Sequence, residues 1–433
     1  MRIPGDKSIT HRALMLSAMA GGESRLRGLL AGEDCQSTAS VLRALGATIP
    51  EIPKDGSEVR VEGAGMAGLR CPTSLLDCGN SGTTARLLLG VLSGLSLEAE
   101  VTGDDSLRSR PMRRVTEPLG EMGASFEGVG EPNRLPLRAK GGQLRPLSYS
   151  SPVASGQVKG AILLAGLCGA VDVTVVEPSR SRDHTERMLR RMGVPVREAV
   201  SAEGWEVSLS PIAGELMPLD LTVPGDFSSA AFLIALGLLR GGSDALRIDN
   251  VGLNPTRTGL LDLFREMGGR IEVHNLREGD DPSGEPVGDL TVFPSVLRGV
   301  AVRGSQIPLI IDEIPILAVT AALATGATEI RNAGELRVKE SDRIRALAHN
   351  LATIGVSAEE YDDGLRIEGQ GGRLSGHVSS WKDHRVAMAF GVLGALPDHD
   401  VSVDEPEVVD VSFPGFWEMV AGKAASVAPD PED

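Results

Sequence analysis

Hydrophobic positions along this chain gather in six segments that repeat one pattern. Each segment begins with a small or polar turn and continues as a helix-length run of mainly Ala, Leu, Gly and Val. It ends at a glycine-rich break before a strand-like run. The first helix-length run covers residues 13–20 and the sixth covers residues 386–390. Because these runs are apolar on nearly all sides, they predict helices buried inside a domain.

The six segments recur at nearly equal distances. Their turns are marked by Asp6, Asn80, Gly156, Asp226, Asp312 and Asp383, which stand 74, 76, 70, 86 and 71 residues apart. Second helices are predicted between them at residues 37–46, 115–123, 185–193, 256–268 and 341–355, with glycines suited to left-handed caps. Alternating runs at residues 59–61, 205–209 and 365–367 predict strands. Repeats of this length predict an α/β fold built from six βαβ-type units.

The chain has 433 residues, enough for two or three domains, and a formal net charge of −16. This charge argues against nucleic acid or an anionic membrane as the main partner. The longest apolar runs, at residues 161–167 and 230–239, are too short to cross a bilayer, and no apolar leader follows Met1. The four cysteines lack the spacing of metal ligands, so they are interpreted as reduced thiols of a cytoplasmic protein.

The polar residues of the six segments concentrate where each helix begins. Several of them are cations, including Lys7, Arg12, Lys159 and Arg385. Ordinary N-capping explains any single turn, but a cation at a helix N-terminus opposes the helix dipole. Such a conflict, when repeated, is expected where helix starts face an anion that their free N–H groups can also bind.

The densest group of charges lies at residues 334–343, directly after a strand-like run at residues 328–330. If a helix begins near Val338, Lys339 and Arg343 fall four residues apart on one face, with Glu340 beside them. Two cations next to a carboxylate can hold an anionic substrate and move a proton. A solvated, salt-bridged helix start is the plain alternative for this segment.

Seven short motifs carry a specific resemblance. They are GDKSITHR at residues 5–12, GNSGT at 79–83, RPM at 110–112, RDHTE at 182–186, NPTR at 254–257, RVKESDR at 337–343 and DHR at 383–385. In this order they closely resemble the 5-enolpyruvylshikimate-3-phosphate (EPSP) synthase family, from about residue 3 to about residue 417. One motif alone would be weak, whereas seven in matching order are highly specific. The chain has no GxxxxGK[ST] loop, so a mononucleotide loop is not indicated.

The resemblance implies two similar lobes, each made of three βαβαββ units with buried helices, and an active site in the cleft between them. It places lobe II at residues 6–221 and lobe I at residues 1–5 plus 222–433. The implied reaction moves the enolpyruvyl group of phosphoenolpyruvate to the 5-hydroxyl of shikimate 3-phosphate and releases phosphate, a step of the shikimate pathway to chorismate. It also implies that these two small molecules are the partners, that the chain is a monomer, and that no metal or organic cofactor takes part.

The resemblance assigns roles residue by residue. It implies Asp312 as the base for the hydroxyl, Glu340 as the proton donor to carbon and Lys7 as a bridge between both substrates. His384 is a further catalytic candidate nearby. The residues implied for shikimate 3-phosphate are Lys7, Ser8, Arg12, Ser155, Gly156, Gln157, Arg182, Asp312 and Lys339. Those implied for phosphoenolpyruvate are Lys7, Asn80, Gly82, Arg110, Gln157, Glu340, Arg343, His384 and Arg385.

Some positions depart from the pattern of many members. Gly156 stands where Ala or Ser is common, which should keep the backbone contact but loosen the loop. Val411 and Arg182 stand where enterobacterial-type members have a Lys and a Tyr-containing segment, so the chain resembles the branch with Arg-Asp-His-Thr-Glu. Relatives usually have a strand before the position of Lys7, so either a shortened first strand or a truncated start is expected.

Two alternatives stay open. The sister enzyme that transfers enolpyruvate to UDP-N-acetylglucosamine shares the fold, but it typically has Lys-Asn in place of Lys7-Ser8. It also commonly has a reactive Cys where this chain has Asp105. A non-catalytic homologue that keeps the anion site is the other alternative. Asp312 and Glu340 argue against it, because a pure binder gains little from carboxylates beside anionic ligands.

Overall fold

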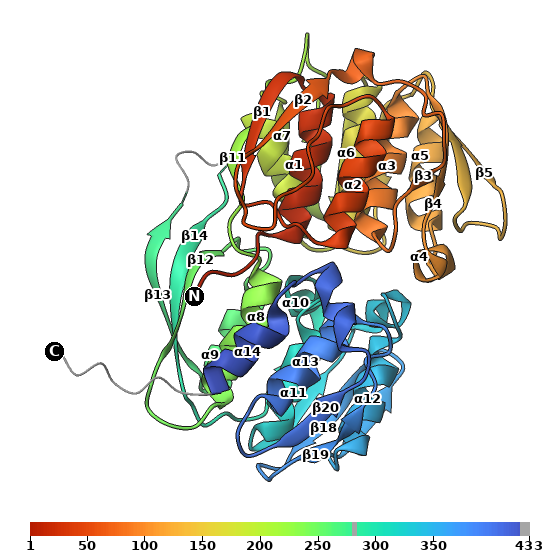
Figure 1. Ribbon diagram of the computed structural model, residues 1–433. Coiled ribbons are helices and arrows are strands. Elements are labelled where there is room, and N and C mark those ends of the chain that lie inside the picture. Colours follow the sequence, from red (N-terminus) through yellow and green to blue (C-terminus); the bar gives the residue numbers. More distant parts are fainter. Residues whose placement is uncertain (279–283, 425–433) are drawn as a thin grey trace, which may run out of the picture.

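The hydrophobic side chains pack into two separate cores, and the chain forms a lobe around each (Figure 1). The structure is a computed structural model that describes residues 1–278 and 284–424. One core draws on residues between Ile9 and Val223, and we call the surrounding body lobe II. The other draws on Ile3 and on residues between Phe227 and Val420, and we call its body lobe I. The predicted two-lobe α/β fold is confirmed.

Lobe II carries three units in sequence. Its helices are α1 (Lys7–Met19), α2 (Glu33–Ala44), α3 (Gly82–Gly94), α4 (Asp105–Ser109), α5 (Arg113–Met122), α6 (Gly156–Cys168) and α7 (His184–Arg191), with a 3₁₀ turn η1 (Met66–Gly68). Its strands are β1 (Gly21–Arg27), β2 (Val59–Ala64), β3 (Leu76–Asp77), β4 (Glu98–Thr102), β5 (Ser125–Gly128), β6 (Leu137–Lys140), β7 (Leu147–Ser150), β8 (Val173–Glu177), β9 (Val196–Ser201), β10 (Gly204–Leu209) and β11 (Asp220–Thr222).

Lobe I repeats the arrangement. Its helices are α8 (Phe227–Leu239), α9 (Gly259–Glu266), α10 (Ile307–Ile310), α11 (Ile314–Leu323), α12 (Arg343–Thr353), α13 (His384–Gly394) and α14 (Phe416–Ala424), with 3₁₀ turns η2 (Gly304–Gln306), η3 (Gly334–Val338) and η4 (Pro406–Val411). Its strands are β12 (Leu246–Gly252), β13 (Arg270–Arg277), β14 (Val287–Phe293), β15 (Ala301–Val302), β16 (Gly326–Ile330), β17 (Ala358–Tyr361), β18 (Gly364–Gly369), β19 (Ser375–Val378) and β20 (Asp400–Val403).

Three of the sheets share one strand order, which is the spatial form of the sequence repeat. The orders are β3-β4-β6-β5, β7-β8-β10-β9 and β15-β16-β18-β17, and in each the first two strands are parallel. The other units are shorter. β11, the last strand of lobe II in the sequence, forms a three-stranded sheet with β1 and β2. β12, β14 and β13 form another three-stranded sheet, and β19 and β20 form a two-stranded sheet. The βαβαββ unit is therefore complete in three copies and abbreviated in the others.

The six apolar runs form the helices α1, α3, α6, α8, α11 and α13, and each is buried as its composition predicts. Small residues let these helices approach closely. A Cβ atom added at Gly90 of α3 would lie 2.3 Å from the carbonyl oxygen of Ala161 on α6. The predicted second helices correspond to α2, α5, α7, α9 and α12, and glycines with positive φ follow them, such as Gly123 at 116°.

The chain passes between the lobes at two neighbouring places. Residues Pro4 and Asp6 pair with Pro224 and Asp226, through Asp6 N–H to the Pro224 carbonyl at 2.8 Å and Asp226 N–H to the Pro4 carbonyl at 2.9 Å. The segment before Lys7 forms isolated bridges to lobe I in place of a full strand. α1 and α8 thus begin side by side, each capped by an aspartate.

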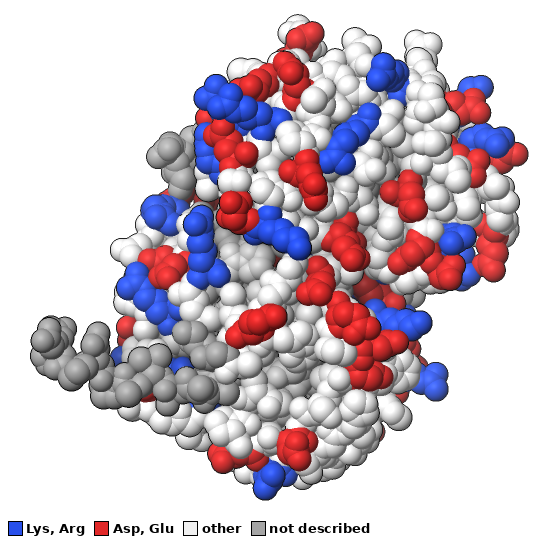
Figure 2. Space-filling view, viewed as in Figure 1, with Lys and Arg blue, Asp and Glu red and all other residues white. Residues whose placement is uncertain are grey.

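Acidic and basic side chains are interspersed on the face drawn in Figure 2, without a continuous basic surface. Among residues 1–278 and 284–424, no single helix is long and apolar enough to span a membrane. One bent pair, Gly304–Ile310 with Ile314–Leu323, passes that test together by length and composition only. Its second helix has nine of its ten residues buried in lobe I.

Candidate active site

A cavity of about 450 Å³ lies between the lobes, where the buried helices of both begin. Eight of the nine residues predicted for shikimate 3-phosphate line it: Ser8, Arg12, Ser155, Gly156, Gln157, Arg182, Asp312 and Lys339. Ser155 caps α6 by accepting a hydrogen bond from Val158 N–H, and Gly156 and Gln157 form the first turn of that helix. The cavity walls therefore come from loops and helix starts far apart in the sequence.

Asp312 lies at the centre of this arrangement, in the turn before α11. Its carboxylate contacts Arg182 across the cleft and lies 3.4 Å from Lys339 Nζ and 3.4 Å from Arg343 Nη1. Burial by itself disfavours the ionised form, but Lys339, Arg182 and their neighbouring cations outweigh it. They hold the pKa of Asp312 well below its ordinary value. The carboxylate is thus ionised and surrounded by cations that an anionic ligand could also use.

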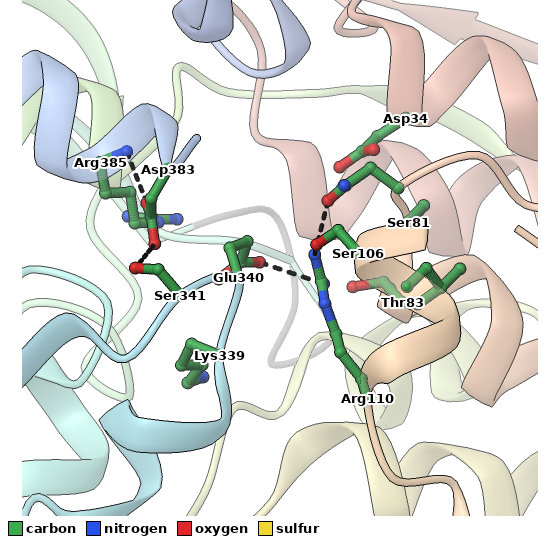
Figure 3. A network of polar contacts seen from close by, with 12 residues as sticks. Asp34, Ser81, Thr83, Ser106, Arg110, Lys339, Glu340, Ser341, Asp383 and Arg385 are labelled. Atoms are coloured by element: carbon green, nitrogen blue, oxygen red, sulfur yellow. Dashed lines mark hydrogen bonds and ion pairs between the residues drawn. The ribbon is translucent and has the colours of Figure 1, made fainter. Parts of the chain in front are cut away.

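Glu340 bridges the two lobes on the side of the residues predicted for phosphoenolpyruvate (Figure 3). Its Oε2 lies 2.7 Å from Arg343 Nη2 in its own lobe, and its Oε1 lies 3.5 Å from Arg110 Nη1 in lobe II. Burial opposes ionisation, but Arg343 and Arg110 overcome it and hold the pKa of Glu340 well below its ordinary value. Arg110 also donates to Asn80 Oδ1 at 2.6 Å, which ties the GNSGT motif to this group.

The remaining predicted residues surround this pair of carboxylates. Arg385 donates to the Asp312 carbonyl at 3.0 Å, and His384 is the first residue of α13. Gly82 begins α3, where its Cα faces Arg86 and Arg110. Gln157 accepts from Arg86 and donates to Thr83. Both predicted sets are therefore brought to one cleft.

Lys7 is the one predicted substrate-bridging residue whose amine does not line the cavity. It lies 3.0 Å from Asp34 Oδ2, a buried carboxylate in the first turn of α2. Burial by itself would lower the pKa of Lys7, but the adjacent Asp34 carboxylate contributes to a net increase above its ordinary value. Lys7 is therefore a cation, and its amine must leave Asp34 or share it to reach a ligand.

The predicted helix through Val338, Lys339 and Arg343 is wrong. Residues 334–338 form a 3₁₀ turn, and α12 begins only at Arg343, capped by the side chain of Asp342. The side chain of Asp342 accepts the N–H of Arg345 and so caps the start of α12. A helix that continues from Val338 through this position is therefore not formed. Lys339 and Glu340 lie on the connecting loop, yet Lys339 and Arg343 both reach Asp312.

Several polar residues at this site were not among the predicted ones. The structure adds Asp34 beside Lys7 and the cavity-lining residues Thr83, Arg86, Arg114, Ser179, Ser181, Asn332 and Glu335. Arg86 carried a usable signal, since it is a cation one turn inside a buried helix. Arg114 and Glu335 form an ion pair across the cleft, at 2.8 Å, and nothing local in the sequence predicts that pairing.

Comparison with known proteins shows the family of this chain. The family model described as EPSP synthase (3-phosphoshikimate 1-carboxyvinyltransferase) matches residues 1–420. The chain belongs to the EPSP synthase family. It is 47% identical over 420 residues to the 3-phosphoshikimate 1-carboxyvinyltransferase of Desulforamulus reducens, covering 96% of this chain and 95% of that protein. It is 50% identical over 421 residues to the protein of that name from Gloeobacter violaceus, covering 97% and 95%.

Solved structures of EPSP synthase give the same fold. The enzyme from Acinetobacter baumannii superposes with a TM-score of 0.82 at 40% identity, covering 98% of this chain and 95% of the other. The enolpyruvyl transferase NikO from Streptomyces tendae, at 20% identity, covers 99% and 96% with a TM-score of 0.74 and shows the fold alone. Membership of the EPSP synthase family confirms the predicted family and transferase class, and the UDP-N-acetylglucosamine alternative is not favoured.

Two buried histidines, His384 and His11, should make the stability of this EPSP synthase family member depend on pH. Burial lowers the pKa of His384 to about 3, and burial also lowers the pKa of His11 well below its ordinary value. Both histidines are neutral when folded but protonate on unfolding below pH ~6.5, the ordinary histidine value. Their stabilisation is thus present above that pH and is lost as the pH falls. The loss should reach about 2.7 kcal/mol per pH unit when both contribute fully.

Urea unfolding at a series of pH values between 7 and 5, above the range in which carboxylates protonate on unfolding, measures this loss. The variant His384→Gln should show about half the slope, because one protonation is removed. His274→Gln is the control, since His274 is exposed on β13. A slope unchanged by His384→Gln would contradict the assignment of His384 as a buried neutral group.

Proposed function

We propose that this chain transfers the enolpyruvyl group of phosphoenolpyruvate to the 5-hydroxyl of shikimate 3-phosphate, releasing inorganic phosphate. The observation that carries the proposal is the cleft itself, with Asp312 and Glu340 set among cations of both lobes. Two phosphates and two carboxylates enter with these substrates, and arginine forks suit both groups. Family membership supports the same reaction.

The cavity also has an apolar side that suits a carbon ring. Val338, which is 44% exposed, lines it together with Ile311 and Pro308. The polar side carries Arg12, Arg182 and Lys339. A ring bearing hydroxyls and one phosphate would contact both, so we assign this cavity to shikimate 3-phosphate. The group around Arg110, Arg343 and Arg385 is assigned to phosphoenolpyruvate.

In the proposed mechanism two protons move in opposite directions. Asp312 accepts the proton of the 5-hydroxyl as its oxygen attacks the central carbon of phosphoenolpyruvate, and Glu340 donates a proton to the methylene carbon. The tetrahedral adduct then loses phosphate by cleavage of the carbon–oxygen bond, and the methyl group returns a proton to Glu340. Lys7 and the arginines stabilise the charge on the phosphate that leaves.

Substrate anions prepare both carboxylates for this role. By themselves the cations depress the pKa of Asp312 and of Glu340, which makes Asp312 a weak base and leaves Glu340 without a proton to give. Anionic substrates that engage Arg182, Lys339, Arg110 and Arg343 neutralise the same cations. The proton affinity of both carboxylates therefore rises only when the substrates are in place.

We further propose residues 6–221 and residues 1–5 plus 222–433 as the two lobes, which the two separate cores support. A single chain supplies both walls of the cleft, so we propose that the protein acts as a monomer. We also propose that it acts in the cytoplasm.

Phosphate release tests the function. The purified protein should release phosphate when shikimate 3-phosphate and phosphoenolpyruvate are supplied together, and neither substrate alone should suffice. UDP-N-acetylglucosamine in place of shikimate 3-phosphate is the control for the sister activity. The proposal would be contradicted if phosphate were released with UDP-N-acetylglucosamine but not with shikimate 3-phosphate. It would also be contradicted if neither acceptor gave release.

Gly82 gives a second test at the phosphoenolpyruvate group. A Cβ atom at this position would lie 2.9 Å from Arg86 Nη1 and 3.5 Å from Arg110 Nη1, so it would crowd two guanidinium groups, of which Arg110 is a proposed phosphoenolpyruvate contact. We expect the analogue glyphosate to inhibit the enzyme. Gly82→Ala should raise the inhibitory concentration at least about tenfold, because a longer ligand tolerates the intrusion less than the substrate does (tenfold is about 1.4 kcal/mol). Inhibition curves of both forms at fixed phosphoenolpyruvate measure this, and equal inhibition would reject the assignment.

A further inference from the structure

Three charged side chains are buried together behind the cavity wall, where no proposed substrate contact uses them. Lys159 of α6 lies 3.0 Å from Glu177 Oε2, at the end of β8, and 2.8 Å from Glu186 Oε1, on α7. Their side chains are 1%, 1% and 0% exposed, respectively. We call this set the buried triad.

Stability alone is a weak explanation for the buried triad. Removing charges from water costs several kcal/mol per ion, and well-packed apolar side chains of similar volume are often at least as stabilising as a buried ion pair. The triad also carries two carboxylates for one ammonium group. What an apolar replacement could not supply is a fixed set of hydrogen-bond acceptors, and Glu177 uses its acceptors on the cavity wall.

Glu177 joins the two loops that form the polar side of the cavity. Its Oε1 accepts the backbone N–H of Ser155 at 2.7 Å, and the hydroxyl of Ser181 lies 2.8 Å from both carboxylate oxygens. Ser155 caps α6, while Ser181 directly precedes Arg182. One carboxylate therefore sets the spacing between the start of α6 and the loop that carries Arg182.

The other end of the triad stands beside Arg12. The guanidinium of Arg12 donates through Nε to Thr185 Oγ1 at 2.7 Å and through Nη2 to the Gly156 carbonyl at 3.1 Å. Thr185 directly precedes Glu186 on α7, so Arg12 is held by the first turns of α6 and α7, next to the two loops that Glu177 joins. Arg12, Ser155 and Ser181 all line the cavity.

We propose that Glu177, held in place by Lys159, is a positioning residue for the shikimate 3-phosphate side of the cavity. It fixes the separation of the Ser155 and Ser181 loops so that Arg12, Arg182 and the start of α6 converge on one anionic group. It touches no substrate, and its contacts are with Lys159, Ser155 and Ser181 rather than with the phosphoenolpyruvate group around Arg110. This inference rests on the proposed function of the cavity.

Replacement of Glu177 by glutamine tests the inference. An amide has one acceptor atom where the carboxylate has two, so its NH₂ group must replace either Oε1, which accepts from Ser155 N–H, or Oε2, which faces Lys159, and that contact is lost. We expect the KM for shikimate 3-phosphate and its Kd by calorimetry to rise about tenfold. The KM for phosphoenolpyruvate and kcat should stay within about twofold.

A second variant and a matched control separate positioning from folding. Glu177→Asp keeps the charge beside Lys159 but withdraws the carboxylate by about 1.5 Å, one carbon–carbon bond, so it should give the same selective loss even if the glutamine variant fails to fold. Asp289→Asn makes the same chemical change at a buried carboxylate that holds the N–H of Asn250 in lobe I, away from the cavity. It should leave both KM values unchanged.

The possible results are distinct. A selective loss of shikimate 3-phosphate affinity in the Glu177 variants supports the inference. Variants that lose only melting temperature, or that lose kcat with both KM values intact, would overturn it. If the unmodified protein itself binds no shikimate 3-phosphate, the proposed function fails first, and the calorimetry of that protein reveals this before any variant is made.

Discussion

Replacing Asp312 by alanine should lower kcat about a thousandfold, within the range that a positioned general base contributes. Asp312 is ionised, buried and held by cations of both lobes, so alanine at this position removes the proposed base from the centre of the cleft. Shikimate 3-phosphate should still bind, because the variant frees Arg182 and Lys339 for its phosphate. Single-turnover phosphate release measures the chemical step, and calorimetry measures binding.

The distinction between turnover and binding is what makes this test specific. A loss of binding as large as the loss of turnover would mean that Asp312 mainly organises the cations. An alanine variant that keeps most of its kcat would exclude Asp312 as the base.

The fold could be predicted from the sequence because its repeating features, the helix caps and the apolar runs, each depend on neighbouring residues. Asp6, Asp226 and Asp383 each cap a buried helix by accepting a backbone N–H, and the apolar run that follows is buried in every copy. Capping and the apolar pattern depend on a few adjacent residues, so they can be predicted without knowing how the lobes are arranged. The sheets were less predictable, since β3 and β15 have only two residues each and their pairing depends on distant strands.

The motifs name many of the residues in the cleft, but they do not show which of these residues contact one another. The motifs selected Asp312, Glu340 and Arg110, yet which cation faces which carboxylate depends on how the lobes meet. Asp34 illustrates the limit. It is an acidic residue in the first turn of α2, where the helix dipole alone would favour it, and only the packing of α1 on α2 brings it to Lys7.

The loop at Lys339 and Glu340 shows a second limit. The spacing of Lys339 and Arg343 fits one helical face, but the stronger local signal is Asp342, which can cap a helix that begins one residue later. The loop conformation then places Glu340 between Arg343 of its own lobe and Arg110 of the other. A continuous helix would have fixed Glu340 on a rigid face; the loop leaves its carboxylate at the junction of the lobes.

Glu340 is therefore the residue whose replacement should most selectively stop the movement of protons to and from carbon. Glu340→Gln keeps the size of the side chain and can still accept from Arg343, but it has no acidic proton, so we expect kcat to fall about a thousandfold. Substrate methylene hydrogens exchange with solvent only if protonation is reversible, so deuterium entering recovered phosphoenolpyruvate in heavy water reports this step directly. Asp342→Asn is the matched control, because asparagine can still cap α12, and its kcat should stay within about threefold. Continued exchange in Glu340→Gln would assign the carbon acid to another group, and Lys7, which is held as a cation beside Asp34, would be the next to replace.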